Sequence, residues 1–207
     1  MTTRILIGLA FTLMLWSCNQ LRQTKRSASS NQNTATELSA YKNSRVDSIA
    51  LFLETALRVD TFQVDHFGPF LFFKSGNMLS KNEKNAIAIY SSTDTTYCVQ
   101  LYSMRERKWE LSDSIDGLDA LPMQFDLIFD DYNFDEQTDL YIQVTASNGW
   151  SLSRGHLITI DPKTKKLKLH TETRDFANMT PDKRTKTVRT ELWNGYNKNE
   201  SVQLTFF

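Results

Sequence analysis

The sequence has few of the residues that cross-link chains or bind transition metals. Only two of its 207 residues are cysteines and only three are histidines. The histidines, at positions 66, 156 and 170, have no paired spacing, which argues against zinc. None of the short motifs of serine hydrolases, zinc proteases or phosphate-binding loops occurs. The sequence therefore predicts a protein that is not an enzyme and that relies on its core rather than on disulfides for stability.

The sequence also lacks a net charge. Its 24 Lys and Arg residues balance 24 Asp and Glu residues, so no overall field favours nucleic acid as a partner. The charges are unevenly placed, because no Lys or Arg occurs between Trp109 and Ser153, a stretch that holds ten acids. This stretch is either a solvated acidic face balanced by basic residues elsewhere, or a local field that suits a cation or a basic partner.

The longest apolar run stands at the amino terminus. Arg4 precedes apolar residues from Ile5 to Trp16, a run that has the length of a signal-peptide core and is too short to span a bilayer. The run ends in Leu-Trp-Ser-Cys at positions 15–18, which resembles the lipobox of bacterial lipoproteins. The resemblance implies that residues 1–17 are a signal peptide and that Cys18 is lipidated, which would anchor the exported protein in the cell envelope. A plain secretory signal with a chance cysteine is the alternative.

The next segment, residues 18–43, is rich in Ser, Thr, Asn and Gln and nearly free of large apolar residues. Such a segment cannot bury enough surface to offset the entropy of ordering it, so we expect a flexible tether. The first charges after Cys18 are basic, Arg22, Lys25 and Arg26, which favours a periplasm-facing anchor. The membrane is thus one expected partner, bound through the lipid on Cys18.

The remaining residues, 44–207, have the pattern of a single mostly-β domain. Apolar residues at helical spacing after Ser44 predict a short helix over 45–57. Runs such as NAIAIYSS, TTYCVQLYSM and DLYIQVTAS are typical of strands, and in one of them we expect Cys98 to be a buried, unreactive thiol. Turn signals at 75–77, 116–117, 148–149, 161–162 and 194–195 separate the runs. We expect an antiparallel sandwich or propeller-like sheets, with one short N-terminal helix.

The motif with the most chemistry is D-Y-N-F-D-E-Q-T-D at 131–139. Oxygen-bearing side chains occupy its first, third, fifth and ninth positions, and a backbone carbonyl is available at the seventh. These candidate metal ligands are Asp131, Asn133, Asp135, Asp139 and the carbonyl of Gln137. Ca²⁺ takes about six to eight hard oxygen ligands, which a coiled loop with alternate acceptors can supply. The alternative is an acidic β-turn that binds no ion.

The sixth position of this motif is Glu136, where calcium loops normally have Gly at a positive φ. We therefore expect either a strained residue or a different turn at Glu136. The twelfth position is Ile142, so the motif is not an EF-hand. The pattern D-x-[DN]-x-D-x-x-x-D-L resembles instead the calcium loops of FG-GAP type in β-sheet proteins.

The surrounding stretch, from Phe125 to about Thr173, is similar to a group of periplasmic calcium-loop lipoproteins related to inhibitors of invertebrate-type lysozymes. The similarity is carried by DYNFDEQTDLYIQ, SNGWSLSRGH and DPKTKKLKL and covers about a quarter of the chain. It implies an all-β domain with calcium in the loop 131–139. It also implies, as for some members of that group, immunity against secreted peptidoglycan hydrolases.

The same resemblance places a partner-binding loop at Ser147–His156. Its candidate contact residues are Ser147, Asn148, Trp150 and Arg154, which combine adaptable hydrogen bonding with two typical interface anchors. An acidic rim beside them would steer a basic, lysozyme-like partner. A hairpin loop with Trp150 packed on the sheet is the alternative.

Two functions remain open from the sequence. The first is a calcium-stabilised envelope lipoprotein that inhibits a lysozyme-like peptidoglycan hydrolase. The second is an envelope glycan-binding module or hydrolase that uses its acidic face.

Overall fold

The computed structural model describes residues 47–67, 70–80, 82–119, 126–147, 152–194 and 199–205. The predicted signal peptide 1–17, Cys18 and the tether 18–43 lie outside these residues, as do Asn148 and Trp150. All the strands that the structure describes belong to the unit Arg45–Phe207. Within the described part of the chain, no helix combines the length and the apolar character needed to cross a bilayer.

A short helix precedes the strands. Residues 47–56 are helical, within the predicted range 45–57, so the helix prediction is confirmed. Ile49 and Ala56 are buried and Phe52 and Leu53 are partly buried, at the i, i+3, i+4, i+7 spacing of one helix face. This face packs in one cluster with Phe73 of the first sheet.

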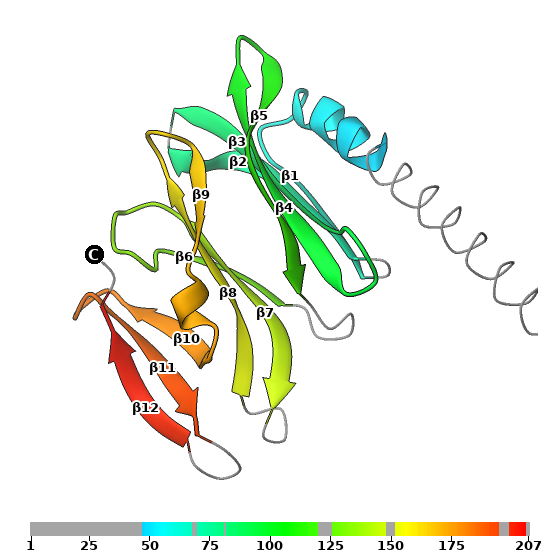
Figure 1. Ribbon diagram of the computed structural model, residues 1–207. Helices are drawn as coiled ribbons and strands as arrows, with labels where there is room; N and C mark the ends of the chain where they lie inside the picture. The colour runs from blue at the N-terminus through cyan, green and yellow to red at the C-terminus, as the bar shows by residue number, and fades with distance from the viewer. Residues whose placement is uncertain are drawn as a thin grey trace, which may run out of the picture. The chain divides into compact units, whose positions relative to one another are not determined.

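The first sheet contains five antiparallel strands that neighbour one another in chain order (Figure 1). They are β1 (Phe62–Phe67), β2 (Phe70–Ser80), β3 (Glu83–Ser91), β4 (Thr96–Arg105) and β5 (Lys108–Asp119). The middle of β3 is buried on both faces, because Ile87 and Ile89 join one core while Ala86 and Ala88 join the cluster under the helix. Cys98 of β4 is buried, as expected.

Two of the predicted turns lie inside strands. Residues 75–77 belong to β2 and residues 116–117 to β5, and the pairing register shifts near both. At the second site Gly117 has φ 75°, and its N–H donates to Asp116 Oδ1 at 2.7 Å. The turn predictions are wrong at these two places, because Gly beside a polar residue favours a β-bulge as readily as a chain reversal.

The second sheet has the strand order β12-β11-β10-β8-β7-β6, with β9 paired to β8 (Figure 1). Its strands are β6 (Asp126–Asp130), β7 (Asp139–Ser147), β8 (Leu152–Asp161), β9 (Lys166–Leu169), β10 (Phe176–Asp182), β11 (Thr187–Trp193) and β12 (Asn199–Leu204). A 3-10 turn, η1 (Thr171–Thr173), lies between β9 and β10. All pairings in this sheet are antiparallel, so the prediction of a mainly-β, antiparallel, sandwich-like fold is confirmed.

Two apolar clusters support the second sheet. In the larger one, Ile87 and Leu101 of the first sheet lie with Leu140 and Ile158 of the second, so the two sheets share a core. The smaller cluster lies entirely in the second sheet and the loop before β7. Its buried members are Tyr132, Tyr141, Leu157, Met179 and Val188. This smaller cluster is the base on which the acidic loop is built.

Candidate functional site

The acidic loop 131–139 connects β6 to β7, where β6 is the last strand in the order of the second sheet. Its second residue, Tyr132, is fully buried. The Tyr132 ring lies 5.9 Å from the ring of Tyr141, and its hydroxyl donates to the carbonyl of Met179 at 3.3 Å. The aromatic side chain thus fixes the start of the loop to the smaller apolar cluster.

Asp139 holds the loop from the inside. This carboxylate is fully buried, and its Oδ2 accepts hydrogen bonds from the backbone N–H groups of Tyr132 (3.0 Å) and Asn133 (3.3 Å). Its Oδ1 accepts from Ile160 N of β8 at 3.0 Å. Burial raises the pKa of Asp139 to about 7, although the three backbone donors oppose the shift. Asp139 therefore ties the beginning of the loop to β8.

The other predicted ligands turn toward the backbone of the loop itself. Asp131 accepts from the N–H groups of Asp135 (3.1 Å) and Glu136 (3.0 Å), using one oxygen for each. Asn133 Oδ1 also accepts from Asp135 N at 3.1 Å, and Asp135 Oδ1 accepts from Gln137 N at 2.8 Å. In these four bonds the acceptor precedes the donor in the chain, so the backbone winds around the polar side chains.

Two residues of the loop adopt a left-handed backbone, Phe134 with φ 61° and Glu136 with φ 66°. That conformation costs a residue with a Cβ about 1–2 kcal/mol, so the hydrogen bonds around it must compensate. Of the two expectations for Glu136, the strained residue is confirmed. The sixth position takes the positive φ that a glycine would adopt without strain.

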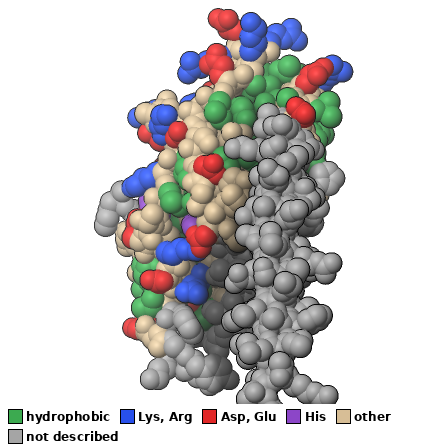
Figure 2. All heavy atoms as spheres, turned by 45° about the vertical axis from the view of Figure 1, so that its right-hand side comes forward, with side chains coloured by type: hydrophobic (Ala, Val, Ile, Leu, Met, Phe, Trp, Pro, Cys, Tyr) green, Lys and Arg blue, Asp and Glu red, His purple; other side chains and the backbone are tan. Residues whose placement is uncertain are grey.

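The charges around the loop are only partly balanced. Several acids of the Lys- and Arg-free stretch pair with basic residues from the last third of the chain: Asp113 with Lys166 (3.4 Å) and Asp130 with Lys183 (3.0 Å). On the face drawn in Figure 2, acidic and basic side chains are accordingly interspersed. Asp131, Asp135 and Glu136, in contrast, form no ion pair with any other described residue. The loop keeps a negative charge that favours a cation.

The donor set of the loop fits a hard cation. Carboxylate and amide oxygens are what Ca²⁺ binds, and a carboxylate has about four lone-pair sites, so Asp131 and Asp135 keep acceptor capacity beyond their bonds to N–H groups. Asp139 already uses three of its lone-pair sites to accept hydrogen bonds from backbone N–H groups. Within the described ranges, no three His, Cys, Asp or Glu side chains converge on one point suited to a metal ion. Binding would therefore require Asp135 and Asn133 to reorient, because Asn133 Nδ2 now donates to Asp135 Oδ2 at 3.0 Å.

The predicted partner-binding loop is in part a strand. Ser147 is the last residue of β7, and Arg154 and His156 lie in β8, so the prediction that Arg154 is a loop residue is wrong. The physical reason is Gly155, which lets β8 approach β7 closely. A Cβ at this position would lie only 1.8 Å from the carbonyl oxygen of Ile142. Gly155, read in the sequence as part of a loop, is a packing residue between two strands.

Arg154 and His156 belong to a charged cluster that the sequence did not predict. Its other members are Asp119, Arg174 and Asp175. His156 Nε2 lies 3.3 Å from Asp119 Oδ1, and Arg174 forms an ion pair with the same carboxylate. Arg154 Nη1 lies 4.0 Å from Asp175 Oδ1. Burial, followed by the charge of Arg174, lowers the pKa of His156. The cluster joins the end of β5 to β8 and to the segment after η1.

Comparison of the chain with protein families, with characterised proteins and with solved structures finds no significant match. Its function is therefore inferred from the chemistry of the acidic loop and of the charged cluster.

Proposed function

We propose that this protein is an exported, lipid-anchored binding protein whose β domain is stabilised by Ca²⁺ in the loop 131–139. The observation that carries the proposal is the coiled, uncompensated loop, in which Asp131, Asn133 and Asp135 turn their oxygens inward and Glu136 takes a glycine-like φ. These three side chains and the carbonyl of Gln137 would hold the ion, with Asp139 as the buried anchor that has at most one site left for it. A bound Ca²⁺ would neutralise the loop and stiffen the link between β6 and β7.

The amino-terminal sequence supports the cellular location. The apolar run that ends at Cys18 favours export and lipid attachment, and the polar segment 18–43 would let the domain reach a partner away from the membrane surface. The basic residues after Cys18 favour an anchor that faces the periplasm.

The proposed partner is a lysozyme-like peptidoglycan hydrolase, which the domain would inhibit. The charged cluster supports a basic partner, because its carboxylates Asp119 and Asp175 are exposed, the first beside Arg174 and the second beside the partly exposed Arg154. Exposed acids steer a basic partner toward the surface, and Arg is a typical anchor of interfaces. An envelope glycan-binding module or hydrolase remains the alternative.

An inhibition assay with the purified mature protein and a lysozyme tests this function. We expect inhibition by the wild type, at least tenfold weaker inhibition by Arg154→Ala, and unchanged inhibition by Lys163→Ala, whose charge lies in a hairpin turn outside the cluster. Asp119→Asn should slow association, most clearly at low salt. Peptidoglycan turnover by the protein itself would contradict the proposal and favour the alternative.

A further inference from the structure

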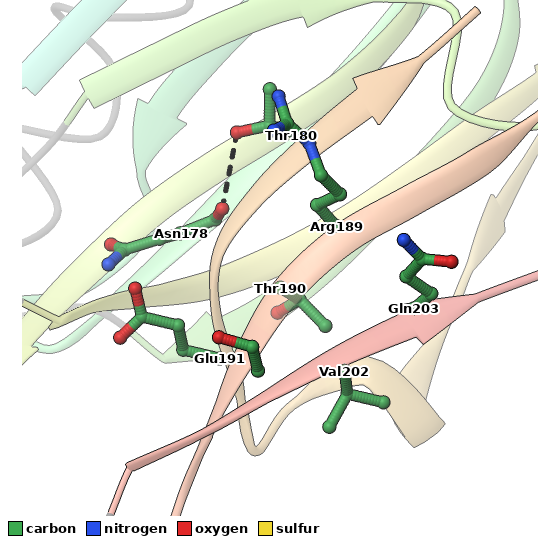
Figure 3. Close-up of a pocket in the computed structure, with 8 residues that line it drawn as sticks. Asn178, Thr180, Arg189, Thr190, Glu191, Val202 and Gln203 are labelled. Carbon is green, nitrogen blue, oxygen red and sulfur yellow. Dashed lines mark hydrogen bonds between the residues drawn. The ribbon is translucent and has the colours of Figure 1, made fainter. Parts of the chain in front are cut away.

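A polar hollow of about 430 Å³ lies over three strands of the second sheet, β10, β11 and β12 (Figure 3). The side chains that matter there come in pairs from the three strands: Asn178 and Thr180, Arg189 and Glu191, and Ser201 and Gln203. All six can form hydrogen bonds through their side chains. Thr190 and Val202 complete the lining, so the hollow is mainly polar, with Val202 as its apolar lining residue.

Strand pairing arranges these side chains in rows. Arg189 of β11 pairs with Thr180 on one side and with Gln203 on the other, and Glu191 pairs with Ser201. Directly paired residues share a face of the sheet, so Arg189 and Gln203 lie side by side, as Figure 3 also shows. The positions of Arg189 and Glu191 are thus fixed by a regular strand rather than by a loop.

The opposite face of β11 is anchored in the protein interior. Val188 is fully buried in the smaller apolar cluster. Thr190 is also buried, and its Oγ1 donates to the carbonyl of Ala177 at 2.6 Å. Arg189 and Glu191, which alternate with these two residues, consequently project from a backbone that has little freedom to move.

The two charges of the hollow are not paired. Within the part of the chain that the structure describes, neither Arg189 nor Glu191 forms an ion pair or a side-chain hydrogen bond. Ser201 and Gln203 likewise make no side-chain hydrogen bond to another described residue. The hollow thus offers a guanidinium, a carboxylate, an amide and a hydroxyl group whose hydrogen-bonding capacity is unused.

We infer that this hollow binds a neutral carbohydrate. Sugar hydroxyls are both donors and acceptors, so neighbouring hydroxyls can accept from Arg189 and donate to Glu191 at the same time. An anion would face Glu191, a cation would face Arg189, and an apolar ligand would leave both charges desolvated. The volume lies within the range of small-ligand sites, about 300–1,000 Å³. This site shares no residue with the acidic loop or with the charged cluster around Asp119.

Titration of the ¹⁵N-labelled mature protein with chitotetraose and with cellotetraose, followed by NMR, tests the inference. We expect at least one of the two sugars to shift the amide resonances of β11 and β12. Arg189→Gln and Glu191→Gln should each weaken binding about tenfold, the loss expected for one charge-assisted hydrogen bond. Arg184→Gln removes an exposed charge from the adjoining turn and should leave the affinity unchanged.

The inference is overturned if neither sugar shifts these resonances at millimolar concentration, or if Arg184→Gln weakens binding as much as Arg189→Gln. The variants change exposed or partly exposed side chains, and an unchanged melting temperature verifies that they remain folded. Lysozyme inhibition is measured separately on the same variants. Lysozyme inhibition without sugar binding by the wild type would overturn only this inference, and sugar binding without lysozyme inhibition would overturn only the proposed function.

Discussion

Three aspartate-led turns connect strands of the second sheet: the acidic loop 131–139 and the hairpin turns 161–166 and 182–187. In the first hairpin turn, Asp161 Oδ1 accepts from Lys163 N (2.8 Å) and Thr164 N (3.1 Å). In the second, Asp182 Oδ1 accepts from Arg184 N (3.0 Å) and Thr185 N (3.3 Å). Both hairpin turns also place a lysine in the left-handed region, Lys165 with φ 56° and Lys186 with φ 53°. They are two copies of one turn.

The acidic loop uses the same kind of side-chain-to-backbone bond but with many more acids. One Asp is enough to cap each hairpin turn, and each of these turns also contains basic residues. The acidic loop gathers Asp131, Asp135, Glu136 and the buried Asp139 without any Lys or Arg. Turn geometry alone therefore does not require this concentration of negative charge. The additional acids of the loop 131–139 are what point to a bound cation.

The largest expected effect comes from removing the buried anchor. Asp139→Ala leaves the N–H groups of Tyr132, Asn133 and Ile160 without an acceptor, at about 1–3 kcal/mol for each buried donor. We expect a loss of about 4 kcal/mol in the free energy of unfolding, measured by urea denaturation without calcium. The matched change in a hairpin turn, Asp161→Ala, should cost much less, because this carboxylate is exposed and its N–H partners can bond to water instead. Equal losses of unfolding free energy in the two variants would contradict the distinction between the acidic loop and the hairpin turns.

Asp139 and Asp161 should also differ in how their protonation changes the stability of the fold. Backbone donors, Thr164 N first, lower the pKa of the exposed Asp161, whereas burial raises that of Asp139 to about 7. Asp161 thus contributes stability above its ordinary pKa, and this contribution is lost as the pH falls. The charged Asp139 opposes folding above pH 7, and this penalty is relieved as the pH falls from about 7 toward 3.8, its ordinary value.

A ¹³C NMR titration of the side-chain carboxyl groups, in the presence of a chelator, measures both values. We expect Asp139 to titrate near neutrality and Asp161 to titrate below its ordinary pKa of 3.8. An Asp139 carboxyl that stays ionised down to pH 4 would show that its three backbone donors outweigh its burial.

The smallest expected effect concerns the left-handed residues. Glu136→Gly relieves the strain of φ 66° and removes one acid, so we expect a gain of at most about 1 kcal/mol in calcium-free protein. Lys165→Gly relieves a similar strain but breaks the ion pair with Glu83 (2.7 Å), in which the lysine is largely buried, so a net loss is expected. Thermal melting of the two variants compares them, and a loss in Glu136→Gly would show that this glutamate supports the loop.

Much of the fold was predictable from local patterns. Alternating apolar residues marked strands such as β3 and β4, and the spacing of Ile49, Phe52, Leu53 and Ala56 marked the helix. The acidic loop was also visible, including the unusual backbone at its sixth position. Such features depend on neighbours in the sequence, which is why sequence patterns reveal them.

What could not be predicted depends on long-range contacts. Gly117 favours a turn by its local chemistry, and only the pairing of β5 with β4 turns it into a bulge. The cluster of Asp119, His156 and Arg174 brings together residues 37 and 55 positions apart. The polar hollow depends on the register of three strands, which no local pattern specifies.

Calorimetric titration of the full mature protein with Ca²⁺ tests the role of the acidic loop most directly, with melting followed in calcium and in chelator. We expect one site that is lost in Asp135→Ala and retained in Asp161→Ala. At a hundred times its Kd, Ca²⁺ should stabilise the wild type by about 2.7 kcal/mol, so that chelation lowers Tm by several degrees. No heat of binding, together with the same Tm in calcium and in chelator, would contradict a calcium site in this loop.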